Sequence, residues 1–128
     1  MVLRMNGRAR HLRERVVERA VQGPGKAPAN ARRAAFENSG VDERARLLVG
    51  KIAHHAWKVT GEDVAVTKSA GAAEDEIFEL AVCAALGQAT RQLESALAAL
   101  DAAEDPDSAQ SVAGPDAYAA GPPPASRN

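Results

Sequence analysis

Residues 73–103 form an unbroken stretch, AEDEIFELAVCAALGQATRQLESALAALDAA, that contains no proline and a single glycine. Most of its residues are alanine, leucine, glutamate and glutamine, which are strong helix formers. Acidic residues occupy positions 74–76, where the dipole of a helix N-terminus favours negative charge. The stretch predicts one long helix. Because no segment of the chain shows the alternation of apolar and polar residues that is typical of a strand, we expect an all-α protein.

The first half of this helix is unusually poor in polar residues. Residues 77–87 are apolar or small except Glu79. A helix that is apolar on all sides lies in the centre of a bundle or in an interface, so we expect nearly its whole circumference to be buried here. Apolar residues make up 45% of the chain but aromatic residues only 3%, so the core buries little area per residue. We therefore expect additional burial in a homo-oligomer.

Two shorter helices are predicted near the N-terminus. Segment 7–22 has apolar residues on one face and charged residues opposite, and the glycines and prolines of 23–30 break it. A short helix over 31–37 is expected to end at NSG, where Gly40 suits the left-handed conformation of a helix C-cap.

Two further helices are predicted between residues 42 and 71. Asp42 is expected to cap a helix over 43–59, and Gly50 inside that helix suggests close backbone packing. Thr60 is followed by acidic residues at positions 62 and 63. It is expected to cap a short helix that ends at Gly71.

The two ends of the chain differ in charge. Residues 1–33 carry nine Lys or Arg against two acidic residues, whereas residues 59–128 carry three against twelve. We predict a basic helical arm and Gly/Pro linker over 1–30, a helical domain over 31–103 and a disordered acidic tail over 104–128. The arm lacks the aromatic residues and motifs of nucleic-acid readers, so we expect it either to be a solvated helix face or to lie on the acidic half of its own or a neighbouring subunit, rather than on nucleic acid.

Several classes of protein are disfavoured by what the sequence lacks. No segment has the roughly 18 consecutive apolar residues of a membrane span, and the N-terminus has no apolar signal-peptide core. We therefore expect no membrane partner and a cytoplasmic location. The single cysteine, Cys83, allows neither an intrachain disulfide nor a metal site of paired thiolates. We predict no metal and no cofactor.

The segments HHAWKVTGEDVAVTKSAG and AGAAEDEIFELAVCAALGQATRQLESAL resemble the carboxymuconolactone decarboxylase-like, or alkylhydroperoxidase D-like, family. In that family a small-residue helix and a glycine turn precede a helix with an acidic start of the type sEDEIFEL. The resemblance covers about residues 10–100 and looks like a short branch of the family. It implies an all-α helical bundle of the carboxymuconolactone decarboxylase-like type, assembled as a homo-oligomer.

Active members of this family carry the motif Cys-x-x-Cys-x-x-x-His. The two thiols share one helix face, so that one can attack a hydroperoxide or disulfide and the other can resolve it. A histidine one turn further on lowers a thiol pKa. Counted back from the glycine turn, these positions fall on Ala56, Val59 and Asp63, and the relay glutamate of the family falls near Arg44, beside Glu43. Neither alanine nor valine forms a thiolate, so the spacing of the motif is kept but its redox-active side chains are missing.

His55, His54, Asp63 and Glu43 are the remaining candidates for acid–base catalysis. The adjacent histidines point about 100° apart on a helix, so they do not readily chelate one metal ion together. We expect one of them to face the core and the other to face solvent. Asp63 would act as a general base if it were buried, and would otherwise be an acidic residue in a helix first turn.

Three other residues each have a structural and a functional interpretation. Cys83 has apolar neighbours, so a buried small hydrophobic group is favoured over a peroxidatic thiol. Glu79 needs a partner within the apolar run, and an ion pair with Arg44, Arg91 or an arginine of the arm is favoured over catalysis. Trp57 is expected to anchor the core or an interface.

The sequence thus predicts a non-redox member of the family. Its role would be that of an accessory or interaction protein, or of a small-molecule binder at the place where the thiols would lie. The alternative is a small enzyme that transfers protons on a lactone or keto acid, or a peroxidase-related antioxidant that works through Cys83. The missing thiols favour the binding role over the enzyme.

Overall fold

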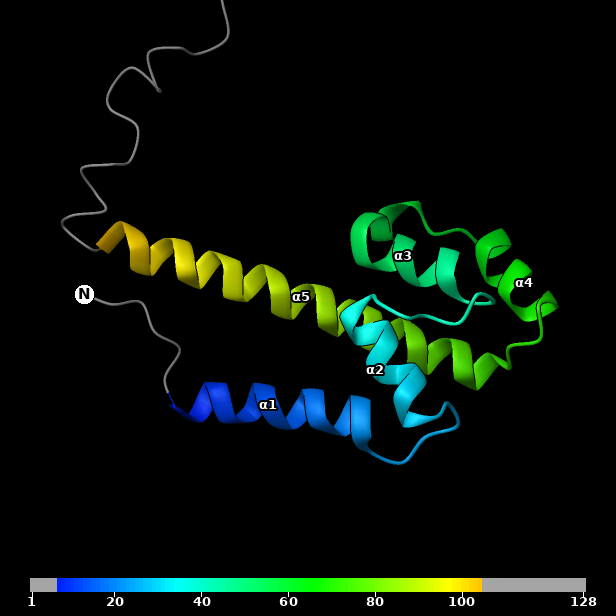
Figure 1. Cartoon of the computed structure of the whole chain (residues 1–128), viewed down its shortest axis with the longest axis horizontal. Helices are drawn as coiled ribbons and strands as arrows, with labels where there is room; N and C mark the ends of the chain where they lie inside the picture. Colours follow the sequence, from blue (N-terminus) through cyan, green and yellow to red (C-terminus); the bar gives the residue numbers. More distant parts are fainter. Residues whose placement is uncertain (1–6, 105–128) are drawn as a thin grey trace, which may run out of the picture. The chain divides into compact units, whose positions relative to one another are not determined.

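A computed structural model describes residues 7–104. They form helices α1 (Gly7–Gln22), α2 (Ala29–Glu37), α3 (Arg46–His55), α4 (Gly61–Ser69) and α5 (Glu74–Glu104), with a short 3-10 helix, η1 (Ala56–Lys58) (Figure 1). The described residues contain no strand, which confirms the prediction of an all-α protein. None of these helices is both long and apolar enough to cross a membrane. The predicted tail lies, apart from Glu104, outside the described residues.

The chain divides after Leu93, and residues 7–93 belong to one compact unit with its own packing. In this part, α1, α2, α3, the loops that join them and the start of α5 share one core. Its buried side chains are Val21, Ala27, Ala35, Val41, Ala45, Val49, Leu80, Cys83 and Ala84. The many alanines allow the helices to approach closely. Residues Val21 and Ala27, from the basic N-terminal segment, therefore belong to the same core as α5.

Helix α5 comes into close backbone contact with the end of α2 at Gly87. A Cβ atom at Gly87 would overlap the carbonyl of Phe36. This carbonyl is in the last turn of α2, where it has no helical partner, and it accepts a hydrogen bond of 2.6 Å from Arg91 Nη1. At Gly50, by contrast, an added Cβ would meet nothing within 4 Å. The prediction of close packing at Gly50 is therefore wrong.

A second, smaller core joins α3, α4 and the first turn of α5. Leu48, Ala72 and Ile77 are buried there, with Ile52, Val59 and Val64 packed against them. Thr60 caps α4, and its hydroxyl accepts from the Asp63 amide while the Asp63 carboxylate accepts from the Thr60 amide. Gly71 follows α4 with φ of 110°, a conformation that favours glycine. Both ends of α4 were predictable from these residues.

Helix α3 is shorter than the helix predicted over 43–59. The Asp42 carboxylate accepts hydrogen bonds from the backbone amide and from Nε of Arg44, at 2.8 and 3.1 Å. Asp42 therefore caps a turn, and α3 begins only at Arg46. At the other end His55 has φ of −145° and ψ of 53°, which ends the α-helix and leads into η1.

Only one side of α5 is buried between residues 77 and 87. Ile77, Leu80 and Cys83 are in the cores, whereas Phe78 is 69% exposed and Ala85 is also exposed. The prediction that nearly the whole circumference is buried is therefore wrong for the single chain. Helices α1, α2 and α3 cover one side of α5 and leave the other side without a partner in this part of the molecule.

Candidate functional site

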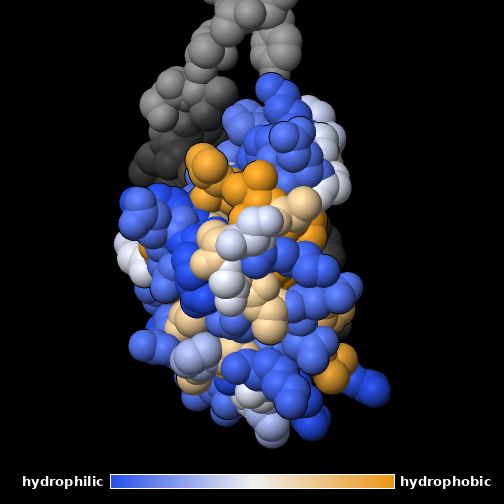
Figure 2. Space-filling model, turned by 90° about the vertical axis from the view of Figure 1, so that its right-hand side faces the viewer, coloured by the Kyte–Doolittle hydropathy of each residue, from blue (hydrophilic) through white to orange (hydrophobic). Residues whose placement is uncertain are grey.

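A hollow of about 390 Å³ lies between α3 and α4. Leu47 and Leu48 are neighbours on α3 and point in different directions, since successive helical residues are about 100° apart. Leu48 is in the core, whereas Leu47 is 81% exposed and faces the hollow together with Val66 of α4. The face that carries α4 shows hydrophobic surface among hydrophilic surface (Figure 2). The lining of the hollow also contains Leu48, Glu43, Arg44, Asp63, Thr67 and Ala70.

Asp63 lies at one edge of this hollow and is fully engaged by neighbours. Lys51 Nζ donates to both carboxylate oxygens at 2.9 Å, and the Thr60 amide donates at 2.8 Å. The hydrogen bond from Lys51, followed by that from the Thr60 backbone, lowers the pKa of Asp63 below its ordinary value. A general base needs an accessible lone pair and a pKa near the operating pH. The arrangement of Asp63 therefore matches an acidic residue in a helix first turn, not a buried base.

Glu43 lines the same hollow from the turn before α3, where it is exposed. Its neighbour Arg44 is paired with Asp42 at 3.1 Å and with Glu76 at 3.6 Å. The structure thus brings two of the sequence candidates, Glu43 and Asp63, to one hollow. The two candidate histidines are not among the residues that line it.

Both histidines are exposed at the end of α3. His54 Nε2 lies 3.0 Å from the side-chain nitrogen of Asn38, and the ring of His55 lies edge-on to Trp57 with centroids 5.2 Å apart. The expectation that one histidine faces the core is wrong, because the last turn of α3 extends past the buried residues. Trp57 is 76% exposed, which also excludes its placement in the core of this chain. Its role in an interface stays a prediction.

The positions of the two family thiols differ in their surroundings. Ala56 is exposed on η1, and Val59 is half-buried against the second core. The only thiol of the chain, at Cys83, is 1% exposed, and its Sγ lies 3.4 Å from the carbonyl oxygen of Ala20. Desolvation raises the pKa of Cys83 above its ordinary value, which disfavours the reactive thiolate. The prediction of a buried small hydrophobic group is confirmed.

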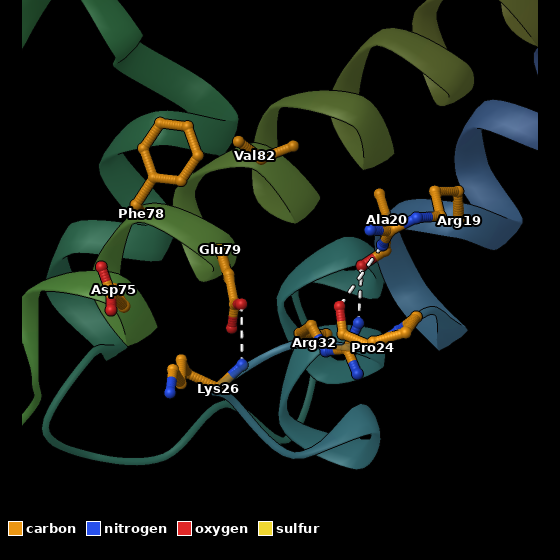
Figure 3. Close-up of a pocket in the computed structure, with 9 residues that line it drawn as sticks. All are labelled: Arg19, Ala20, Pro24, Lys26, Arg32, Asp75, Phe78, Glu79 and Val82. Atoms are coloured by element: carbon orange, nitrogen blue, oxygen red, sulfur yellow. Dashed lines mark hydrogen bonds between the residues drawn. The ribbon is translucent and has the colours of Figure 1, made fainter.

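A second hollow, of about 330 Å³, lies between the end of α1, the loop after it and the start of α5 (Figure 3). Glu79 points from α5 toward the loop, where its carboxylate accepts from the backbone amides of Lys26 at 2.7 Å and Ala27 at 2.6 Å. The Ala27 amide is the main cause of a lowered Glu79 pKa. The predicted ion pairs of Glu79 with Arg44 or Arg91 are wrong, because both arginines bind elsewhere and these loop amides lie nearer.

Arg32 is a buried residue that the sequence reasoning missed. It is only 5% exposed, and its Nε and Nη1 donate to the carbonyls of Ala27 and Ala20, each at 3.1 Å. The Ala20 carbonyl lies in the last turn of α1, where no N–H of the helix is available to donate to it. A signal was present, because Arg32 precedes Ala35 by three residues and therefore shares its helix face. Lys51 was also missed, although it stands between the apolar residues of α3.

Within residues 7–104, no group of three or more His, Cys, Asp or Glu side chains is arranged to hold a metal ion. Comparisons with family models, with curated proteins and with solved structures found no match to this chain. Membership of the carboxymuconolactone decarboxylase-like family therefore stays a prediction from the sequence resemblance.

Proposed function

We propose that this chain is a non-redox member of the carboxymuconolactone decarboxylase-like family that binds a small, largely apolar molecule in the hollow between α3 and α4. The observation that supports this most is the exposure of Leu47, at 81%, and Val66, at 55%, on the wall of one hollow. Large apolar side chains facing water in a concave site favour an apolar ligand, since its binding removes that surface from water.

The polar groups of the hollow define what such a ligand carries. Arg44 offers hydrogen-bond donors beside the apolar wall, and Glu43 offers an acceptor. The volume of about 390 Å³ is at the lower end of the range of roughly 300–1,000 Å³ for small-molecule sites. We infer a compact ligand with an apolar body and one polar or anionic end that faces Arg44.

Redox chemistry is disfavoured by the positions of the reactive atoms. Ala56 and Val59 carry no thiol, and Cys83 is buried in the other core with a raised pKa. We expect no consumption of a hydroperoxide above the background measured without protein, and no change on Cys83→Ser. Hydroperoxide consumption that Cys83→Ser abolishes would refute the non-redox assignment.

Proton-transfer catalysis is the alternative, and Glu43 is the candidate that lies in the hollow. His54 and His55 lie outside the lining, and Asp63 is held ionised by Lys51. Turnover of a lactone or keto acid that survives Cys83→Ser but is lost in Glu43→Gln would favour this enzyme. Loss in His55→Ala instead would place the chemistry outside the hollow.

Ligand binding is tested with the fluorescent probe anilinonaphthalene sulfonate, whose rings suit the apolar wall and whose sulfonate suits Arg44. We expect saturable binding that weakens at least tenfold in Leu47→Glu and Val66→Glu. Phe78→Glu serves as the matched control, because Phe78 is similarly exposed but lies on α5, away from this hollow. Equal affinity in all three variants would contradict the assignment of the hollow as the binding site.

A further inference from the structure

The unburied side of α5 carries a regular apolar seam. Phe78, Val82, Ala85 and Ala89 follow one another at intervals of four, three and four residues, so they share one helix face. We call these four residues the α5 seam. Phe78 is 69% exposed, Ala85 and Ala89 are exposed, and Val82 is half-buried. The buried residues Leu80, Ala84 and Gly87 lie on the opposite side of the helix.

Over most of the length of the seam, helix α5 itself carries no charged residue. Residues 80–90, LAVCAALGQAT, include no charged side chain. An exposed helix on a single chain normally carries charged residues on its outer side. The same region therefore has one apolar side packed in the chain and a second apolar side facing water, which is the pattern of a helix placed between two packing partners.

We propose that the α5 seam is the contact surface of a homodimer, in which α5 of a second copy packs antiparallel across a two-fold axis near Val82. This proposal is independent of the ligand site, because no residue of the seam lines the hollow between α3 and α4. The spacing of four and three residues is that of helices that pack side by side at a shallow angle. The occupant is thus a helix with the same repeat.

The distribution of side-chain size along the seam favours a second copy in the antiparallel direction. Its N-terminal end is large, at Phe78, and its C-terminal end is small, at Ala85 and Ala89. Antiparallel packing places each Phe78 over the two alanines of the other copy and fills the space they leave. Parallel packing would instead set Phe78 against Phe78 and leave a gap between the alanines. Self-complementarity of this kind is what a two-fold interface requires.

The size of the seam indicates a reversible dimer. From Phe78 to Ala89 the helix rises by roughly 17 Å, or about three turns. Specific interfaces bury about 800 Å² per partner, so the seam needs support from its flanks. The half-buried Leu86 and Leu93 lie beside it on α5, and the hollow of Figure 3 borders it at Phe78 and Val82. A second copy of α5 would cover these flanking groups as well as the seam.

The first test is the mass of the full chain in solution, measured by light scattering over a range of concentrations. We expect twice the 13.4 kDa of one chain at high concentration. Phe78→Glu and Ala85→Glu place charges in the seam and should raise the dissociation constant at least tenfold, with helicity by circular dichroism unchanged. Leu47→Glu is the matched control on α3 and should leave the mass unchanged. The proposal would be overturned if the parent chain were monomeric, or if Leu47→Glu were the only variant that dissociates the dimer.

The second test fixes the direction of packing by cross-linking of chains in which Cys83→Ala has removed the native thiol. Val82→Cys lies at the proposed axis, so two copies should form a disulfide, which requires Cα atoms within about 7 Å. Ala89→Cys lies seven residues further on, so its two copies would be roughly 21 Å apart in the antiparallel dimer and should not cross-link. Cross-linking at both positions would show parallel packing, and cross-linking at neither would exclude the α5 seam.

Discussion

At the scale of single residues, Glu79 connects segments that are distant in the sequence. Its two carboxylate oxygens bind the consecutive amides of Lys26 and Ala27, in a loop that has no helix or strand to satisfy them. Gly25 makes this possible, because a Cβ there would come within 2.7 Å of Glu79 Oε1. One carboxylate thus joins α5 to the loop that ends α1.

Replacement of this carboxylate should change the dependence of stability on pH. The pKa of Glu79 is lowered from 4.5 in the folded chain, so its contribution is complete above pH 4.5 and is lost as the pH falls through the lower folded pKa. We expect Glu79→Gln to lower the free energy of unfolding at pH 7 by about 1 kcal/mol, since part of the carboxylate is still reached by water. The deficit should shrink in acid.

Urea denaturation at pH 7 and at pH 3 measures this effect. Glu43→Gln, which removes an exposed carboxylate from a turn, is the control. It should change the free energy of unfolding at either pH by no more than a few tenths of a kcal/mol. A Glu79→Gln deficit of the same size at both pH values would show that the side chain acts by packing and not by its charge.

Replacement by alanine should change the stability of the protein in opposite directions at two glycines that lie in helices. At Gly87 a Cβ would overlap the backbone of Phe36, so Gly87→Ala should destabilise by about 1–3 kcal/mol. At Gly50 the space is open, so Gly50→Ala should stabilise by up to about 1 kcal/mol through helix propensity. Thermal unfolding of both variants beside the parent checks this. Stabilisation at Gly87 would contradict the close contact of α5 with α2.

At the scale of elements, α4 shows how a short helix is fixed by its ends. Its nine residues are too few to form a stable helix alone. Thr60 and Asp63 satisfy each other's amides at the start, and Gly71 adopts a positive φ after the end. Lys51 of α3 then holds Asp63, so the cap also joins α4 to α3.

Removal of the cap should weaken α4 measurably. We expect Thr60→Ala to lower the free energy of unfolding by about 1 kcal/mol, because the Asp63 amide loses its acceptor. Thr60→Ser keeps the hydroxyl and should retain most of the stability. Hydrogen exchange of the amides of α4 would show the loss locally, and unchanged exchange in Thr60→Ala would indicate that packing alone maintains this helix.

Helix α5 illustrates the limit of prediction at this scale. Its start and its length follow from the acidic first turn and the lack of proline, and both were predicted within a residue or two. Which side of it is buried was not predictable, because both sides of residues 77–87 are apolar. The same ambiguity affected Leu47 and Leu48, of which only the second is in the core. Burial there depends on the crossing positions of other helices.

At the scale of the whole molecule, the proposed dimer should make unfolding depend on protein concentration. For two chains that unfold as they separate, Tm should rise by roughly 3 °C for each tenfold increase in concentration. Phe78→Glu should abolish this dependence, since the variant is already monomeric, while Leu47→Glu should keep it. A parent Tm that is independent of concentration across the range where light scattering detects dimers would contradict coupled unfolding.

The sequence alone determined the helical class, the ends of most helices and the absence of thiol chemistry at Ala56 and Val59. These depend on local backbone preferences or on which atoms a side chain contains. The tertiary structure decided that Glu79 binds loop amides, that Lys51 binds Asp63, that Gly87 marks the helix crossing and that one apolar side of α5 remains open. These depend on contacts between distant residues, because several partners of suitable chemistry exist in the chain and only the packing of the helices selects among them.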